Sequence, residues 1–155
     1  MSVKIASLLT VAAIISIMAG VLIYLQVPKE EILEGRFGIY LENDELVISD
    51  NDIIWYNKTS HEIKLTGEGV EKIAALRVSA HGEPFAVKLD NRVIYTGSFW
   101  TPFSSIPYSG VVILNFPIYN NVYEISAGYH AFVSIDPRND NEIFGYFENV
   151  GKLIT

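Results

Sequence analysis

The chain divides at Pro28 into an uninterrupted apolar segment and a longer region in which short apolar runs alternate with polar turns. Residues 5–27 contain no charged side chain. An α-helix rises about 1.5 Å per residue, so roughly 20 apolar residues are needed to cross the hydrocarbon core of a bilayer. The pattern therefore predicts a transmembrane anchor over residues 1–28, a short stalk over residues 29–35 and a folded domain over residues 36–155.

Two other interpretations of the apolar segment stay open. A cleaved signal peptide has a shorter apolar stretch followed by small residues at the cleavage site, whereas this stretch ends in Tyr-Leu-Gln-Val at residues 24–27. A helix buried in a soluble domain is rarely apolar on every face. A retained single-pass anchor in the cell membrane is the prediction. Lys4 before the span favours an N-terminus in the cytoplasm and a C-terminal domain outside it.

The region after residue 35 shows the short alternating runs that are typical of strands joined by tight turns. Strands are predicted over residues 36–41, 46–48, 53–56, 62–65, 85–89, 92–96, 111–116, 122–125 and 131–135. The clearest hairpin joins the fifth and sixth of these through Asp90 and Asn91, because both residue types tolerate a positive φ.

Two amphipathic helices are predicted between the strands. The first covers residues 67–77 and follows Thr66, a residue type that caps helix N-termini. The second follows Asp136, with Asn139 as a competing N-cap, and ends at Gly151. Strands and helices in this order predict an α+β fold, with a mostly antiparallel sheet and two helices packed on one face.

The net negative charge of the chain belongs to the folded region. The 155-residue chain is 50% hydrophobic and still has a formal net charge of −7. All 18 acidic side chains follow Pro28, so the apolar excess belongs to the anchor and the negative charge to the domain. Phosphate backbones repel such a surface, so no nucleic-acid partner is predicted. The absence of cysteine excludes disulfides, thiolate nucleophiles and zinc–thiolate sites.

The ionisable side chains form no motif that predicts a reaction. The three histidines, which include His81 and His130, lack the spacing of metal-binding motifs, so no metal and no cofactor is predicted. A membrane-tethered hydrolase is the alternative to a non-enzymatic domain, and its site would combine His81 or His130 with Asp136 or Asp140. That alternative needs a histidine within hydrogen-bond reach of a carboxylate in a cleft.

The most informative stretch is residues 93–123, which carry no charge. Within it, residues 97–110 are predicted to form a loop, because glycine, serine and proline are frequent there. The aromatic side chains of this loop either fold back onto the core or form an apolar recognition surface. The candidate contact residues are Phe99, Trp100, Phe103 and Tyr108.

Residues 62–94 combine several features in a fixed order. A short strand runs into Leu-Thr-Gly-Glu-Gly at residues 65–69, a helix continues to Leu76, and a strand–turn–strand follows over residues 84–94. This succession resembles part of the extracytoplasmic region of the SecD/SecDF translocation factors. The resemblance implies a compact α+β module outside a membrane. It does not extend to the multi-helix membrane domain or its proton-relay acids, so it implies no translocation activity.

These observations predict a single-span membrane protein whose extracytoplasmic domain is a non-enzymatic interaction or accessory module. The expected partner is another membrane or envelope protein. The alternatives are the tethered hydrolase and a glycan- or lipid-binding domain that uses the aromatic loop at residues 97–110. Exposure or burial of the loop aromatics distinguishes these possibilities.

Overall fold

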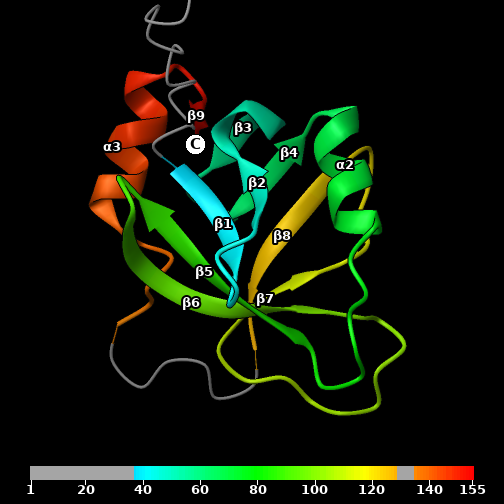
Figure 1. Cartoon of the computed structure of the whole chain (residues 1–155). Coiled ribbons are helices and arrows are strands. Elements are labelled where there is room, and N and C mark those ends of the chain that lie inside the picture. The colour runs from blue at the N-terminus through cyan, green and yellow to red at the C-terminus, as the bar shows by residue number, and fades with distance from the viewer. Residues whose placement is uncertain (1–36, 129–134) are drawn as a thin grey trace, which may run out of the picture. The chain divides into compact units, whose positions relative to one another are not determined.

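The computed structural model describes residues 37–128 and 135–155 (Figure 1). The predicted anchor and stalk, His130 and all but the last residue of the strand expected over residues 131–135 lie outside the described residues. In the described ranges, no helix has the length and apolar character needed to cross a membrane.

The described residues form an α+β domain around one nine-stranded sheet, with strand order β2-β1-β5-β6-β7-β8-β4-β3-β9. Only the pairs β6–β7 and β3–β9 are parallel, so the predicted mostly antiparallel sheet is confirmed. The strands are β1 (Phe37–Leu41), β2 (Leu46–Ser49), β3 (Ile53–Asn57), β4 (Glu62–Leu65), β5 (Glu83–Leu89), β6 (Arg92–Trp100), β7 (Val111–Leu114), β8 (Val122–Ala127) and β9 (Leu153–Ile154).

The sheet is curled because a short link joins strands from its opposite ends. The link is η1 (Asp50–Asp52), a single 3₁₀ turn that connects the edge strand β2 to β3, the last strand but one at the other end. A link of this length reaches only if the two ends of the sheet approach each other. Figure 1 shows the resulting curl, with β2 and β3 next to one another.

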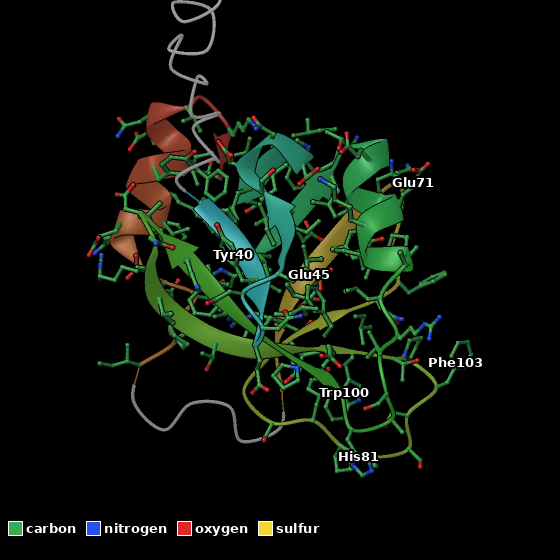
Figure 2. The ribbon with its side chains drawn as sticks, viewed as in Figure 1. Tyr40, Glu45, Glu71, His81, Trp100 and Phe103 are labelled. Carbon is green, nitrogen blue, oxygen red and sulfur yellow. The ribbon has the colours of Figure 1, made fainter. Side chains whose placement is uncertain are left out.

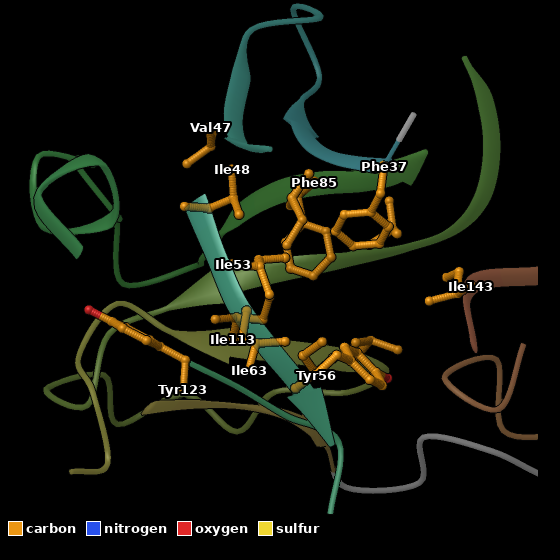
Figure 3. Close-up of a cluster of buried hydrophobic side chains, with 14 of the residues drawn as sticks. Phe37, Val47, Ile48, Ile53, Tyr56, Ile63, Phe85, Ile113, Tyr123 and Ile143 are labelled. Atoms are coloured by element: carbon orange, nitrogen blue, oxygen red, sulfur yellow. The ribbon is translucent and has the colours of Figure 1, made fainter. Parts of the chain in front are cut away.

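Two helices close the curl by packing between strands from its two ends. Helix α2 (Gly67–Ala74) packs against β2 and β4. Helix α3 (Asn141–Asn149) places the ring of Phe147 4.8 Å from that of Phe37 in β1 and 5.2 Å from that of Tyr56 in β3. Both helices therefore contribute to one hydrophobic core, which Figure 3 shows in close-up.

The core follows from the alternation of side chains along the strands. Phe37 and Ile39 of β1 and Phe85, Val87 and Leu89 of β5 are buried at every second position, as expected for strands with one face toward the core. Burial of each such side chain stabilises the fold by about 1.5–3 kcal/mol. The period-two pattern therefore determines which face of the sheet turns inward.

The turn and cap signals were correct at some positions and wrong at others. Asp90 and Asn91 form the predicted two-residue turn, with φ of 49° and 64°. The hydroxyl oxygen of Thr66 accepts a hydrogen bond from the Gly69 amide, which confirms this N-cap. Helix α2 ends at Ala74, three residues before the predicted end at Arg77.

The N-cap predicted for the second helix was wrong. Asp140 caps α3, and neither Asp136 nor Asn139 does. The carboxylate of Asp136 is occupied instead by the guanidinium and backbone amide of Arg138. The predicted helix end is confirmed, since Gly151 adopts the positive φ of 71° that a chain reversal after a helix requires.

Strand β6 is longer than the sequence pattern predicts. Residues 97–100 were expected in a loop. Residues 97–99 pair with β5 on one side and with β7 on the other, and Trp100 pairs with β7. Pairing on both sides outweighs the weak strand propensity of Gly97 and Ser98. The loop is therefore confined to residues 101–110, and it is the crossover between the parallel strands β6 and β7.

Candidate functional site

The two parallel strands β6 and β7 end side by side. Trp100 pairs with Leu114, and the Asn115 amide donates a hydrogen bond of 2.8 Å to the carbonyl oxygen of Trp100. Carboxyl ends of parallel strands lie at the same edge of a sheet, so the loops that leave them begin next to each other. The crossover loop (residues 101–110) and the loop over residues 115–121 both start at this edge.

The four candidate contact residues have different environments. Phe99 is fully buried, and its ring lies 5.0 Å from that of Phe85 in the core. Trp100 is the next residue of the strand and points to the opposite face. It is also buried, with 9% of its surface exposed, and its ring lies 5.8 Å from that of the half-buried Tyr108. Phe103 is 94% exposed. The structure thus brings Trp100 and Tyr108 together, leaves Phe103 in solvent and places Phe99 in the core.

Two glycines allow the backbone to contact the Trp100 and Tyr108 rings closely. A Cβ on Gly82, where φ is +84°, would lie 2.4 Å from the Trp100 ring. A Cβ on Gly128 would lie 2.5 Å from the Tyr108 ring. The Ser104 hydroxyl also donates a hydrogen bond of 2.7 Å to the Ala80 carbonyl oxygen. The crossover loop is therefore held in place, and the two rings have fixed positions.

A cavity of about 550 Å³ lies between the crossover loop and the outer face of the sheet, within the size range of small-molecule pockets. None of the described residues that line it is charged. Those residues are Trp100, Thr101, Pro102, Ser104, Ser105, Ile106, Pro107, Tyr108, Leu114, Ala127 and Gly128. Phe103 lies between two of them without lining the cavity, so its ring is directed away from it. Figure 2 shows Trp100 and Phe103 at the same end of the domain.

The neighbouring loop adds exposed apolar side chains that the sequence analysis did not single out. Phe116 is 64% exposed and Tyr119 is 53% exposed, and Ile118 between them is also exposed. Their loop is held by a turn in which Asn120 and Asn121 both have positive φ. The absence of charge over residues 93–123 was the available signal, because it covers both loops. We call the exposed residues Phe103, Ile106, Phe116, Ile118 and Tyr119 the uncharged edge.

The residues of the alternative hydrolase site have other roles or lie apart. His81 is exposed in the turn before β5, and no hydrogen bond joins its imidazole to a carboxylate in the described part of the chain. The Asp140 carboxylate accepts hydrogen bonds from the amides of Glu142 and Ile143. The Arg138 guanidinium holds the pKa of Asp136 below its usual value. His130 lies outside the described residues.

A buried polar cluster escaped the sequence analysis. The Tyr56 hydroxyl and His61 Nδ1 are 3.3 Å apart, and Arg138 donates a hydrogen bond of 2.8 Å to the carbonyl oxygen of Ile125. Burial lowers the pKa of His61, and the positive charge of Arg138 lowers it further. The same burial raises the pKa of Tyr56. Both groups are therefore neutral near pH 7, and Arg138 ties the segment before α3 to β8.

The ionisable side chains do not assemble into a metal centre among the described residues, where no group of three or more His, Asp or Glu side chains is placed to hold an ion. Comparisons with protein-family models, with curated proteins and with solved structures find no match. The resemblance of residues 62–94 to the SecD/SecDF region stays a prediction. The proposed function consequently depends on the cavity and the uncharged edge.

Proposed function

We propose that this chain is a single-span membrane protein and that its α+β domain is a non-enzymatic interaction module outside the cytoplasm. A transmembrane helix over residues 5–27 holds the domain at the cell membrane. Within the domain, helices α2 and α3 cover the core face of the sheet. The partner is another membrane or envelope protein. The single observation that carries the proposal is the 94% exposure of Phe103 beside an uncharged cavity.

An exposed phenylalanine does not contribute the free energy of hydrophobic burial to folding. Burial of a side chain of this size is worth about 1.5–3 kcal/mol, and Phe99, four positions earlier, obtains it in the core. Contiguous exposed apolar side chains are typical of protein or membrane contact sites. Rigid aromatic anchors next to a pocket are the arrangement found at the energetic centre of protein interfaces.

The chemistry of the alternative hydrolase site supports the non-enzymatic function. Its two carboxylates, Asp136 and Asp140, already bind an arginine and a helix N-terminus. A general base needs a free acceptor within hydrogen-bond reach of its substrate. Arg138 binds both carboxylate oxygens of Asp136, and Oδ1 of Asp140 accepts both amides at the start of α3. The high negative charge of the domain also disfavours nucleic acid as the partner.

The cavity favours a second candidate function, a glycan- or lipid-binding domain. Trp100 and Tyr108 offer ring surface, and Thr101, Ser104 and Ser105 offer hydroxyl groups. Apolar rings with a few polar groups are the usual lining of a small-ligand pocket. The absence of charge restricts this candidate to neutral sugars or apolar lipid chains.

The test is site-specific photo-crosslinking in native membranes that have been washed with alkaline carbonate. A photoreactive side chain replaces Phe103 in the full chain. The matched control places it at Val93, which is 49% exposed near the start of β6, the strand that leads into the crossover loop. A protein adduct of discrete mass is expected from position 103 and not from position 93. Carbonate-resistant retention of the full chain, with release of a chain that lacks residues 1–28, is expected in the same samples.

Two results would contradict the proposal. Release of the full chain by the carbonate wash would show that residues 5–27 do not anchor it in the membrane. Adducts of equal yield from positions 93 and 103 would show that the uncharged edge has no preferred contact. Adducts to glycan or lipid alone would support the second candidate function.

A further inference from the structure

We infer that the partner of the uncharged edge is a second copy of this chain, and that Phe103 of each copy enters the cavity of the other. The inference rests on the proposed function, because the membrane anchor brings the copies together. It also specifies the partner further, since a second anchored copy of this chain is itself a membrane protein.

The surface is self-complementary. A two-fold dimer joins the same patch on both copies, so every protruding group must find its receptor on that same patch. Phe103 protrudes, with 94% of its surface exposed. Its two chain neighbours, Pro102 and Ser104, line the cavity. The protruding ring and the cavity therefore lie next to each other on one surface. A two-fold axis that passes between them can then place the ring of each copy in the cavity of the other.

The cavity suits a phenyl ring. Its walls include Trp100, Tyr108 and Leu114, which offer two aromatic rings and an aliphatic side chain. Aromatic rings pack favourably in tilted or edge-to-face arrangements, such as the 58° between the Trp100 and Tyr108 rings. No described lining residue is charged, so an incoming ring leaves no ion without water. The cavity volume of about 550 Å³ leaves room for the ring without displacing the crossover loop.

Charge determines where two copies can approach. Residues 29–155 carry 18 acidic and 10 basic side chains, whereas residues 93–123 carry neither. Like-charged surfaces repel each other, and the cost is several kcal/mol when like charges meet in an interface. The uncharged edge contributes no charge of its own, so two copies that meet there bring no like charges of these two loops together.

The anchor compensates for the small size of the contact. A stable dimer of soluble proteins buries about 800 Å² on each partner, more than the few side chains of the uncharged edge provide. Tethering both copies to one bilayer raises their effective concentration and converts a weak contact into a populated one. The dimer is therefore expected for the full chain in a membrane.

The experiment measures energy transfer between full-length copies in phosphatidylcholine vesicles. The chain contains no cysteine, so the exposed Thr59, in the turn between β3 and β4, is replaced by cysteine as the only labelling site. We expect energy transfer above that of randomly distributed anchored copies. Phe103→Lys, which removes the ring, and Ala127→Glu, which places a charge in the cavity, should each lower the dimer affinity at least tenfold.

The decisive sample mixes the two variants. In a two-fold dimer of one Phe103→Lys copy and one Ala127→Glu copy, one contact pairs the new lysine with the new glutamate and the other is unchanged. Energy transfer should return in the mixture and stay absent in each variant alone. Val93→Lys is the matched control, because it adds the same charge at an exposed position of β6 that is remote in sequence from the crossover loop, and it should leave energy transfer unchanged.

The inference is overturned if anchored wild-type copies show only random energy transfer, or if the mixture fails to restore it. Quenching of a label at position 103 by a lipid-phase quencher, without energy transfer, would identify the bilayer as the occupant. Photo-crosslinks from position 103 to a different protein, without energy transfer, would overturn the dimer and leave the proposed function intact. Loss of the chain from membranes would instead overturn the proposed function.

Discussion

At the scale of residues, neighbours in sequence have opposite roles because a strand alternates its side chains. Phe99 points into the core and Trp100 points to the cavity on the other face. Phe103, beyond the strand end, points to solvent. The sequence marks all three as aromatic residues in an uncharged stretch, and it does not show where the strand ends. The end of the strand depends on pairing with β7, whose residues lie later in the chain, so no local sequence pattern marks it.

Asp52 supplies a prediction about pH. Its buried carboxylate accepts hydrogen bonds of 2.8 Å from Lys72 Nζ and from the Ser49 amide and hydroxyl. Burial alone would raise the pKa of Asp52, but the bonds from Lys72 and Ser49 outweigh it and lower the pKa. A carboxyl group whose pKa is lowered by folding stabilises the fold above its unfolded pKa, and this contribution disappears as the pH falls through the folded pKa.

Asp52→Asn should therefore lower the free energy of unfolding by about 2 kcal/mol near pH 7, because it weakens charge-assisted hydrogen bonds. The deficit should shrink as the pH falls below about 4, the ordinary range of an aspartate pKa. Thermal unfolding of the full chain in detergent micelles, followed by circular dichroism, measures both effects. Asp44→Asn is the control, since Asp44 is 80% exposed in its pair with Lys88, and a loss as large as that of Asp52→Asn would contradict the argument.

At the scale of elements, caps and connections determine how the helices and strands begin and end. Thr66 caps α2 as its sequence context predicts. The start of α3 was mispredicted because the sequence offered Asp136 and Asn139 as caps, whereas Asp140, a neighbour of the same capping type, is the residue that caps the helix. Arg138 binds the carboxylate of Asp136, so this carboxylate does not cap the helix. Sequence patterns for helix caps do not include such a contact. A crossover without a helix between β6 and β7 was likewise unexpected, since such connections usually contain one.

The corrected cap yields the second stability prediction. Asp140→Ala should lower the free energy of unfolding by about 1 kcal/mol, because it removes the acceptor for two amides at the start of α3. Asn139→Ala, at the adjacent exposed position, should change stability by less than about 0.5 kcal/mol. The same thermal unfolding measurement checks both variants. Equal losses from the two substitutions would mean that Asp140 is not the effective cap.

At the scale of the whole molecule, closure of the curl explains the architecture. The link at η1 forces the sheet ends together, and Phe147 of α3 fills the space between Phe37 and Tyr56. This closure leaves the carboxyl edge of β6 and β7 uncovered by either helix in the described residues. The uncharged edge and the cavity are consequences of that arrangement.

Phe147→Ala should therefore be among the most destabilising substitutions in the domain. Removal of a buried phenylalanine costs about 3–5 kcal/mol, and Phe147 is fully buried between strands from both ends of the sheet. Val150→Ala is the control, because Val150 lies just beyond the same helix and is 43% exposed. A midpoint of thermal unfolding unchanged by Phe147→Ala would show that α3 does not close the curl.

The sequence by itself determined the features that depend on local patterns. Alternating apolar positions predicted most strands, Asp90 and Asn91 predicted the hairpin turn, and the order of elements predicted the α+β class. These signals are local because backbone preferences and side-chain alternation act over a few residues. The sequence also located the uncharged stretch over residues 93–123.

Only the tertiary structure decided which aromatic side chains are exposed and where the cavity lies. Phe99 and Phe103 are the same residue type in the same uncharged stretch, yet one is buried and the other is 94% exposed. The difference arises from pairing of β6 with β5 and β7, strands that come from separate parts of the chain. Long-range pairing of this kind leaves no local pattern, so neither the pocket behind the crossover loop nor the uncharged edge could be derived from neighbouring residues alone.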